Sequence, residues 1–199
     1  MKYIITLLLI FALLSCNMMS CQDEDLVNAQ KSFSEGKYDD AISYYQKAVI
    51  KKKDEPNIWF ALGLTFFQVK KFKDAKNSFM KAIQLKPDFS EAYLGLGKTC
   101  FYRLELEQAE NAFKNAIANE ADFPEADNGL GKLYEFNEEF DKAKEAYNHA
   151  IRLDPNYSPA YLGISIVFLK EGDHEKSMEY YNKYQDQKKA TKAAAEKNK

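Results

Sequence analysis

The stretch from Pro56 to Pro87 reads PNIWFALGLTFFQVKKFKDAKNSFMKAIQLKP. Its first half carries a large apolar stripe at helical spacing, made of Trp59, Leu62 and Phe66. Its second half carries a narrower stripe of Ala75, Phe79 and Ala82. Each stripe is one face of a helix, and each needs a facing helix to bury it. The stretch therefore predicts two helices that pack on each other across a short turn.

The same pattern returns with a period of 34 residues. A small residue followed four positions later by an aromatic occurs five times, as Ala41/Tyr45, Ala75/Phe79, Ala109/Phe113, Ala143/Tyr147 and Ser177/Tyr181. A second small position recurs in the first helix of each pair, as Ala29, Gly63, Gly97, Gly131 and Ser165. Large side chains there would hold the two helices apart. The sequence thus predicts five helical pairs, in residues 22–55, 56–89, 90–123, 124–157 and 158–191.

The order of tryptophan, leucine-glycine, aromatic, alanine, aromatic and proline in residues 56–87 resembles the tetratricopeptide repeat. The resemblance implies an all-α, right-handed α-solenoid of about five helix-turn-helix repeats. Repeat one is the least typical, as terminal repeats commonly are. Repeat four departs from the pattern by having Asp127 where its neighbours have an aromatic residue.

Proteins of this family bind extended peptides or helices in a groove lined by the first helices. Carried over position by position, the groove comprises Phe33, Phe60, Leu64, Phe67, Leu94, Lys98, Phe101, Tyr102, Asn128, Lys132, Glu135, Leu162, Ile166 and Leu169. In repeat two, Phe60, Leu64 and Phe67 also form a second apolar face that the following helix cannot bury. Leaving such side chains in water forgoes roughly 1.5–3 kcal/mol each, which favours a partner. The alternative is that neighbouring repeats or the chain's own termini cover this row.

Two lysines recur at one position of this groove, one repeat apart. Lys98 and Lys132 could hold an acidic group of a ligand, or they could be solvated, and Lys132 could pair with Glu135 one turn away. Some family members hold a chaperone's acidic C-terminus with a clamp of lysine, asparagine and arginine. The matching positions here are Leu26, Gln30, Ala61, Glu91 and Gly95, so that clamp is absent.

Residues 1–15 differ from the repeats. Lys2 is followed by an apolar run from Tyr3 to Leu14 that only Thr6 interrupts. The run is too short for a membrane span of about 20 residues but fits the ~7–15 residues of a signal-peptide core. We therefore predict an export signal over residues 1–15. The alternatives are an ordinary secretory signal cut nearby, or a short apolar segment with no such role.

Leu13-Leu14-Ser15-Cys16 resembles the bacterial lipobox, which implies a lipid-modified, palmitate-bearing Cys16 as the mature N-terminus. Cys21 is a second candidate for the lipid. Residues 16–24 would then form a polar tether, whose acidic end looks like the stretch that sends some bacterial lipoproteins to the cell surface. The expected location is the cell envelope, lipid-anchored to a bacterial membrane and facing the periplasm or the outside. At the other end, the Lys- and Ala-rich residues 188–199 carry no apolar stripe, and we expect them to fray.

Composition excludes several classes of function. Of the 199 residues 46% are hydrophobic and 29% charged, which is typical of a soluble domain, and the net charge of −2 argues against nucleic acid as a partner. No HExxH, GxSxG, phosphate loop or paired-cysteine motif is present, so we expect no enzyme activity, metal or cofactor. His149 and His174 are interpreted as surface or turn residues. Cys100 stands where other repeats have an aromatic, so we expect a buried thiol with no disulfide.

The predicted function is a membrane-anchored, non-enzymatic scaffold that binds a segment of one or more envelope proteins in its groove. The alternative is self-association into a homo-oligomer through repeat five. The first helix of that repeat is apolar nearly all round, with Tyr161, Leu162, Ile164, Ile166, Val167, Phe168 and Leu169. Such a helix is expected to be covered by something.

Overall fold

The computed structural model describes residues 24–197, with the side chains of residues 191 and 193–197 left out. This part of the chain is all-helical and folds as an α-solenoid, as predicted. Its ten helices form five successive hairpins: α2 (Glu24–Ser34) with α3 (Tyr38–Lys51), α4 (Pro56–Gln68) with α5 (Phe72–Leu85), α6 (Ser90–Tyr102) with α7 (Leu106–Asn119), α8 (Pro124–Phe136) with α9 (Phe140–Leu153), and α10 (Ser158–Glu171) with α11 (His174–Lys197).

An aromatic ring between two glycines sets the spacing of the helices. Phe79 on α5 is fully buried, and a Cβ at Gly63 of the same repeat would lie 2.8 Å from its ring. A Cβ at Gly95 of the next repeat would lie 2.6 Å from the same ring. The arrangement recurs with Phe113 between Gly97 and Gly129, and with Tyr147 between Gly131 and Gly163. The contact within each pair is the one predicted, whereas the second glycine, which brings the next repeat close, was not predicted.

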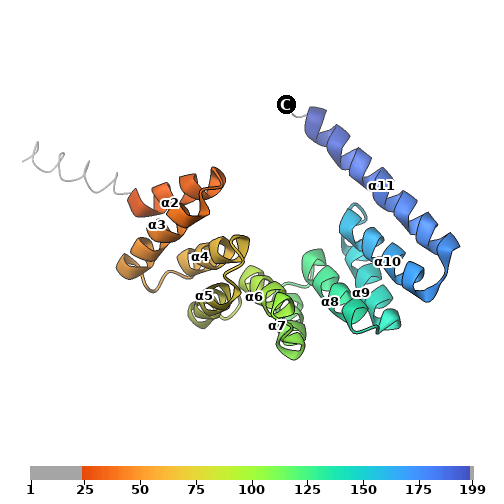
Figure 1. Ribbon diagram of the computed structural model, residues 1–199, viewed down its shortest axis with the longest axis horizontal. Coiled ribbons are helices and arrows are strands. Elements are labelled where there is room, and N and C mark those ends of the chain that lie inside the picture. The colour runs from red at the N-terminus through yellow and green to blue at the C-terminus, as the bar shows by residue number, and fades with distance from the viewer. Residues whose placement is uncertain (1–23, 198–199) are drawn as a thin grey trace, which may run out of the picture.

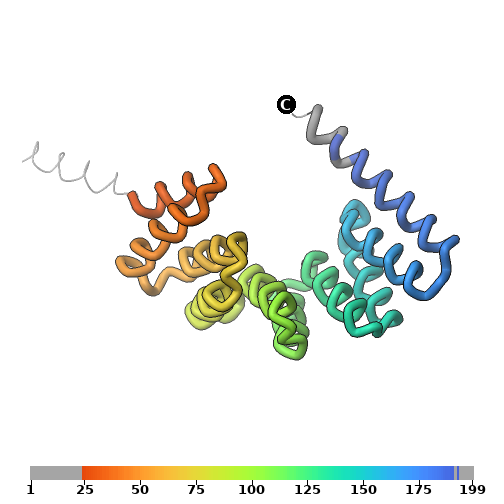
Figure 2. The backbone as a smooth tube through the Cα atoms, in the orientation of Figure 1, coloured from red at the N-terminus to blue at the C-terminus, as the bar shows by residue number. Residues whose placement is uncertain are grey.

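The solenoid curves because its first and second helices pack differently. Neighbouring first helices touch, with α4 on α6, α6 on α8 and α8 on α10, while no comparable contact joins neighbouring second helices in the described part. First helices therefore lie on the inner side of the curve and second helices on the outer side. Figure 1 shows the hairpins along an arc whose ends, α2 and α11, rise on the same side. The backbone tube in Figure 2 follows the same arc.

The C-terminal segment differs from the expectation of a frayed tail. Helix α11 continues through Lys197, past residue 191 where the fifth repeat was expected to end. Alanine and lysine are strong helix formers, so the segment can extend a helix that repeat five has already started. Helix α11 therefore continues through this segment although the segment has no apolar stripe.

Other predictions concern the cysteines and the N-terminus. Cys100 is buried and free, and burial raises its pKa to about 11. The signal peptide of residues 1–15 and the lipidation candidates Cys16 and Cys21 lie outside the described residues. Within residues 24–197, no helix has the length and apolarity needed to cross a membrane.

Candidate functional site

The inner side of α4 and α6 holds a cavity of about 220 Å³. Its lining combines apolar side chains of both helices with polar groups at the edge: Phe60, Leu64, Phe67, Gln68, Phe79, Glu91, Leu94, Gly95 and Lys98. Five of these residues belong to the predicted groove, namely Phe60, Leu64, Phe67, Leu94 and Lys98. We refer to this cavity as the inner pocket. It lies on the concave face because α4 and α6 are first helices in contact with each other.

The apolar row of the inner pocket is partly covered by the protein itself. The Phe60 ring packs 5.9 Å from the Phe79 ring and 4.9 Å from the Phe89 ring, measured between centroids. Phe60, Leu64 and Phe67 are half-buried, and Leu94 is buried. Phe79 and Phe89 belong to the same repeat as Phe60, so the second helix of the pair covers part of this row, contrary to the expectation that it could not. The remaining exposed surface is that of an open pocket.

Aromatic rings form a rim where the first helices end. The ring of Tyr102 lies 5.5 Å from that of Phe67 and stacks at 5.4 Å on that of Phe72. Phe101 in turn lies 5.7 Å from Phe136 of the next repeat. Tyr102 is 61% exposed and Phe136 is 51% exposed, so the rim faces solvent. Phe136 was missed by the sequence analysis, although it stands one repeat after Tyr102 and the 34-residue period could have found it.

The remaining apolar groove residues lie near the two ends of the arc. Phe33 is half-buried and packs 5.5 Å from Tyr38 at the end of α2. Leu162 and Ile166 on α10 are half-buried, and Leu169 is 53% exposed. None of these four residues lines the inner pocket. Of the predicted groove, the part on α4 and α6 encloses a cavity.

The two groove lysines make no ion pair with any described residue, and both are exposed. The pKa of Lys98 is lowered, first by partial burial in the groove and then by the positive charge of Lys132, while Glu125 acts in the opposite direction. The pairing of Lys132 with Glu135 does not occur. Instead, Glu135 accepts hydrogen bonds from Lys170 Nζ at 2.9 Å and from Tyr147 Oη at 3.0 Å.

Asn128 of α8 lies at the groove position that Phe60 and Leu94 occupy in the preceding repeats. It is 6% exposed, and its Oδ1 atom has no hydrogen-bond partner among the described residues. Buried polar atoms are nearly always hydrogen-bonded, so an unpartnered acceptor requires an explanation.

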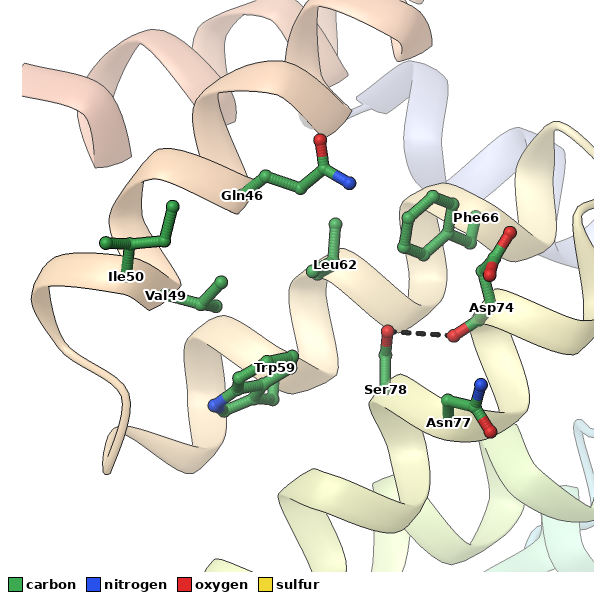
Figure 3. Close-up of a pocket in the computed structure, with 9 residues that line it drawn as sticks. All are labelled: Gln46, Val49, Ile50, Trp59, Leu62, Phe66, Asp74, Asn77 and Ser78. Carbon is green, nitrogen blue, oxygen red and sulfur yellow. Dashed lines mark hydrogen bonds between the residues drawn. The ribbon is translucent and has the colours of Figure 1, made fainter.

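The outer side of the solenoid also has a hollow, of about 450 Å³, between α3 and α5 and above α4. Figure 3 shows its lining, which comprises Gln46, Val49, Ile50, Trp59, Leu62, Phe66, Asp74, Asn77 and Ser78. A hollow of about 360 Å³ recurs two repeats later around Asp127, Leu130 and Tyr134. Both outer hollows form because the second helices diverge on the outside of the curve. Their volumes exceed that of the inner pocket because of this curvature, and the inner pocket remains the stronger candidate for a binding site.

A histidine–aspartate pair lies in the second outer hollow. His149 Nδ1 is 2.7 Å from Asp127 Oδ2, and Asp127 is 5% exposed. Burial raises the pKa of Asp127, which His149 and Arg152 partly oppose. The sequence analysis interpreted His149 as a surface or turn residue. The one sequence feature that pointed to this pair was Asp127, which stands where neighbouring repeats have an aromatic residue. No cluster of metal-ligating side chains occurs in residues 24–197, and Asp127 stands where the neighbouring repeats have Tyr93 and Tyr161.

Comparison with known families supports the repeat assignment. The model described as TPR repeat matches residues 30–70. Two models described as tetratricopeptide repeat match residues 56–89, and residues 101–156 and 128–194. No curated protein matches the sequence.

Solved structures with the same fold are numerous. A crystal structure of MamA protein is 28% identical, covers 83% of this chain and 90% of its own, and has a TM-score of 0.71. TTC0263 from Thermus thermophilus is 20% identical, with a TM-score of 0.69 and coverage of 82% and 89%. YrrB, described as a TPR protein with an unusual peptide-binding site, is 19% identical, with a TM-score of 0.62 and coverage of 80% and 82%. The last two likenesses concern the fold alone.

Proposed function

Because the chain contains tetratricopeptide repeats along most of its length, we propose that it is a non-enzymatic scaffold that binds a segment of another protein in its inner groove. The observation that carries the proposal is the inner pocket. Its walls are apolar and aromatic, and most of them stand on α4 and α6, two first helices that contact each other. A cavity of about 220 Å³ is smaller than most small-molecule sites, so it suits side chains of a protein segment better than a cofactor.

The bound segment would be an extended peptide or one face of a helix. Each partner side chain that moves from water into the pocket contributes roughly 1.5–3 kcal/mol. The exposed rings of Tyr102 and Phe136 extend the apolar surface beyond the pocket. The peptide-binding site in YrrB, a protein of the same fold, is consistent with a peptide as the ligand class.

We further propose that the scaffold acts in a bacterial cell envelope, anchored to the membrane by lipid on Cys16. The support comes from the apolar run of residues 3–14 and the lipobox-like Leu13-Leu14-Ser15-Cys16. The partners would then be other envelope proteins. Cys21 remains the second candidate for the lipid.

The proposal is tested by cross-linking in cells followed by mass spectrometry. Phe60→Glu with Phe67→Glu places two carboxylates in the inner pocket, and Ile50→Glu is the matched control on the outer face, where Ile50 is 80% exposed. Circular dichroism establishes that each variant remains folded. We expect the double variant to lose a cross-linked partner that the control retains. If both variants keep the same partners as wild type, the inner groove is not the binding site.

Self-association is the second candidate, and one observation favours it. Tyr181 on α11 is 41% exposed, whereas its counterparts Phe79 and Tyr147 are fully buried by a following repeat. Nearby Met178 is 59% exposed. However, α10 itself is covered by α8, α9 and α11, so the face expected to drive stacking is not bare. Sedimentation that depends on concentration in wild type, and no longer does in Tyr181→Glu, would favour this candidate over a monomeric binder.

A further inference from the structure

The ends of the first helices and the turns that follow them form one edge of the solenoid, which we call the turn edge. The ring of Tyr102 stacks on that of Phe72 there, with 5.4 Å between centroids. Phe101 joins this pair to the next repeat, since its ring lies 6.2 Å from Tyr102 and 5.7 Å from Phe136. Tyr102, Leu104 and Phe136 are 61%, 66% and 51% exposed. A contiguous exposed apolar strip marks an interaction site more often than scattered single side chains do.

Leu104 stands at the tip of this edge in a conformation that the fold does not require. Its φ is 59°, and the terminal repeats have Gly36 and Gly172 at the same turn position. A residue with a Cβ is strained there, whereas glycine is not. The leucine therefore adds backbone strain while most of its side chain stays in water. Strained residues of this kind cluster at functional sites.

The shape of the strip favours a lipid surface over a bound peptide. The strip projects from the ends of helices, and Tyr102, Leu104 and Phe136 line none of the three hollows described above. A peptide would need a groove to lie in, whereas the interfacial region of a bilayer deforms around projecting side chains. Tyrosine is suited to that region, because its ring enters the apolar layer while its hydroxyl stays hydrated.

Two cations flank the strip where it begins in repeat two. Lys70 and Lys73 stand on either side of Phe72 in the chain, and both are exposed. Neither makes an ion pair with any residue that the structure describes. Lysines beside exposed apolar side chains are typical of surfaces that contact anionic lipids, because their charge is attracted to the headgroups while the apolar groups enter the interface.

The carboxylates of this edge do not cancel that charge at repeat two. Asp74 lines the outer hollow, and Glu105 accepts hydrogen bonds from two cations of repeats two and three. Glu107 and Glu138 are exposed, but they belong to repeats three and four. The attraction to an anionic surface is therefore centred on repeat two, beside the stacked rings.

The length of chain before the repeats allows the turn edge to reach a membrane that also holds the proposed anchor. Helix α2 begins at Glu24 and runs toward the turn edge, so the chain enters the solenoid at the opposite edge. The width to be spanned is that of a first helix, which is about 20 Å for the 13 residues of α4. Residues 17–23, between Cys16 and Glu24, can span up to about 25 Å. A lipid on Cys16 can therefore lie in the membrane that the turn edge touches.

We propose that the turn edge of repeats two and three lies on an anionic lipid surface, with Tyr102 and Leu104 in the interface and Lys70 and Lys73 over the headgroups. This inference goes beyond the proposed function, because it assigns a second surface to the scaffold and orients it. The first helices stand on the membrane by their C-terminal ends, so the groove between them runs along the membrane surface and stays open to a partner.

The test measures which side of the full-length chain touches vesicles of phosphatidylethanolamine and phosphatidylglycerol. Trp59 is the single tryptophan, so Trp59→Phe gives a background without tryptophan emission. Tyr102→Trp places a probe on the turn edge, and Met80→Trp places a matched probe on α5, where Met80 is 50% exposed. Vesicles with their bound protein are isolated by flotation, and lipids brominated in their acyl chains quench a tryptophan that enters the bilayer. Circular dichroism checks the fold of every variant.

We expect brominated lipid to reduce the emission of Tyr102→Trp by about half or more and to leave that of Met80→Trp unchanged. Adding Leu104→Gly to the Tyr102→Trp chain should keep the fold and lower the quenching by about twofold or more, because an apolar side chain leaves the interface. Adding Lys70→Gln with Lys73→Gln should lower the quenching on anionic vesicles and not on vesicles of neutral lipid alone.

Three results would overturn this inference: equal quenching of the two probes, no quenching of Tyr102→Trp on floated vesicles, or failure of the chain to float. Capture of a protein by a photo-cross-linking amino acid at Leu104 in cells, without quenching on vesicles, would make the turn edge a protein interface instead. None of these results bears on the proposed function, which is tested at Phe60 and Phe67.

Discussion

Three residues adopt a left-handed backbone conformation that glycine would adopt at less cost. Lys70, Leu104 and Glu138 have φ of 59°, 59° and 60° in the turn between the two helices of repeats two, three and four. The same turn position in the terminal repeats holds Gly36 and Gly172, with φ of 73° and 84°. For residues with a Cβ this conformation costs roughly 1–2 kcal/mol, so the three middle turns store strain.

Leu104→Gly is therefore predicted to stabilise the protein. Leu104 is 66% exposed, so its removal sacrifices little buried surface. The relief of strain, less the entropy that glycine adds to the unfolded chain, should raise the free energy of unfolding by roughly 0.5–1 kcal/mol. Urea unfolding followed by circular dichroism measures it. Lys114→Gly, at an exposed position in the middle of α7, is the control and should destabilise by a similar amount. A loss of stability in Leu104→Gly would show that the turn carries no such strain.

At the scale of the helix pair, the contact between ring and glycine decides the packing. Gly97→Leu is predicted to destabilise the protein by about 3 kcal/mol, because a Cβ there would already lie 2.6 Å from the ring of Phe113. Phe113 is 2% exposed and held on both sides, so it cannot move aside. Thermal melting measures the effect, and Lys98→Leu, at the exposed next position of α6, is the control. A melting temperature equal to that of wild type would mean that the two helices do not meet at this glycine.

Much of each helix pair could be predicted from the sequence, because the period of 34 aligns landmarks that have one packing role. The small position at Gly97 and the aromatic at Phe113 were found in this way. Gly95 and its equivalents were missed, since their role is to admit the ring of the preceding repeat and depends on how repeats stack. The turn strain at Leu104 was missed too, because a leucine gives no sign of a positive φ.

Five of the predicted groove residues line one cavity, but periodicity alone could not show which members of the set enclose it. The inner pocket forms where Phe60 and Leu64 meet Leu94 and Lys98 of the next repeat. In repeat four, Asn128 and Lys132 occupy the positions of Phe60 and Leu64, and the arrangement of such polar side chains depends on the ion pairs and hydrogen bonds that surround them. The local sequence pattern suggested that Glu135 pairs with Lys132, one helical turn away. Glu135 is instead bound by Lys170, which lies 35 residues farther along the chain on another helix, so a local pattern could not predict the contact.

At the scale of the whole molecule, the proposed anchor makes a prediction that is independent of the groove. Cys16→Ala should release the protein from membranes into the soluble fraction, because the lipid would be its attachment. Fractionation of cells with metabolic labelling by a palmitate analogue measures both location and lipid. Cys100→Ala is the matched control and should leave labelling unchanged, since that thiol is buried in the repeats. Labelling that persists in Cys16→Ala and disappears in Cys21→Ala would move the anchor to Cys21.

The curvature of the solenoid gives the molecule an inner and an outer face with different chemistry, and we assign partner binding to the inner face. The most direct test places a photo-cross-linking amino acid at Phe67, on the inner pocket, or at Ile50, on the outer hollow, in living cells. We predict that Phe67 captures a distinct partner protein and that Ile50 does not. Capture of a partner from Ile50 alone would contradict this assignment and place binding on the outer side of the repeats.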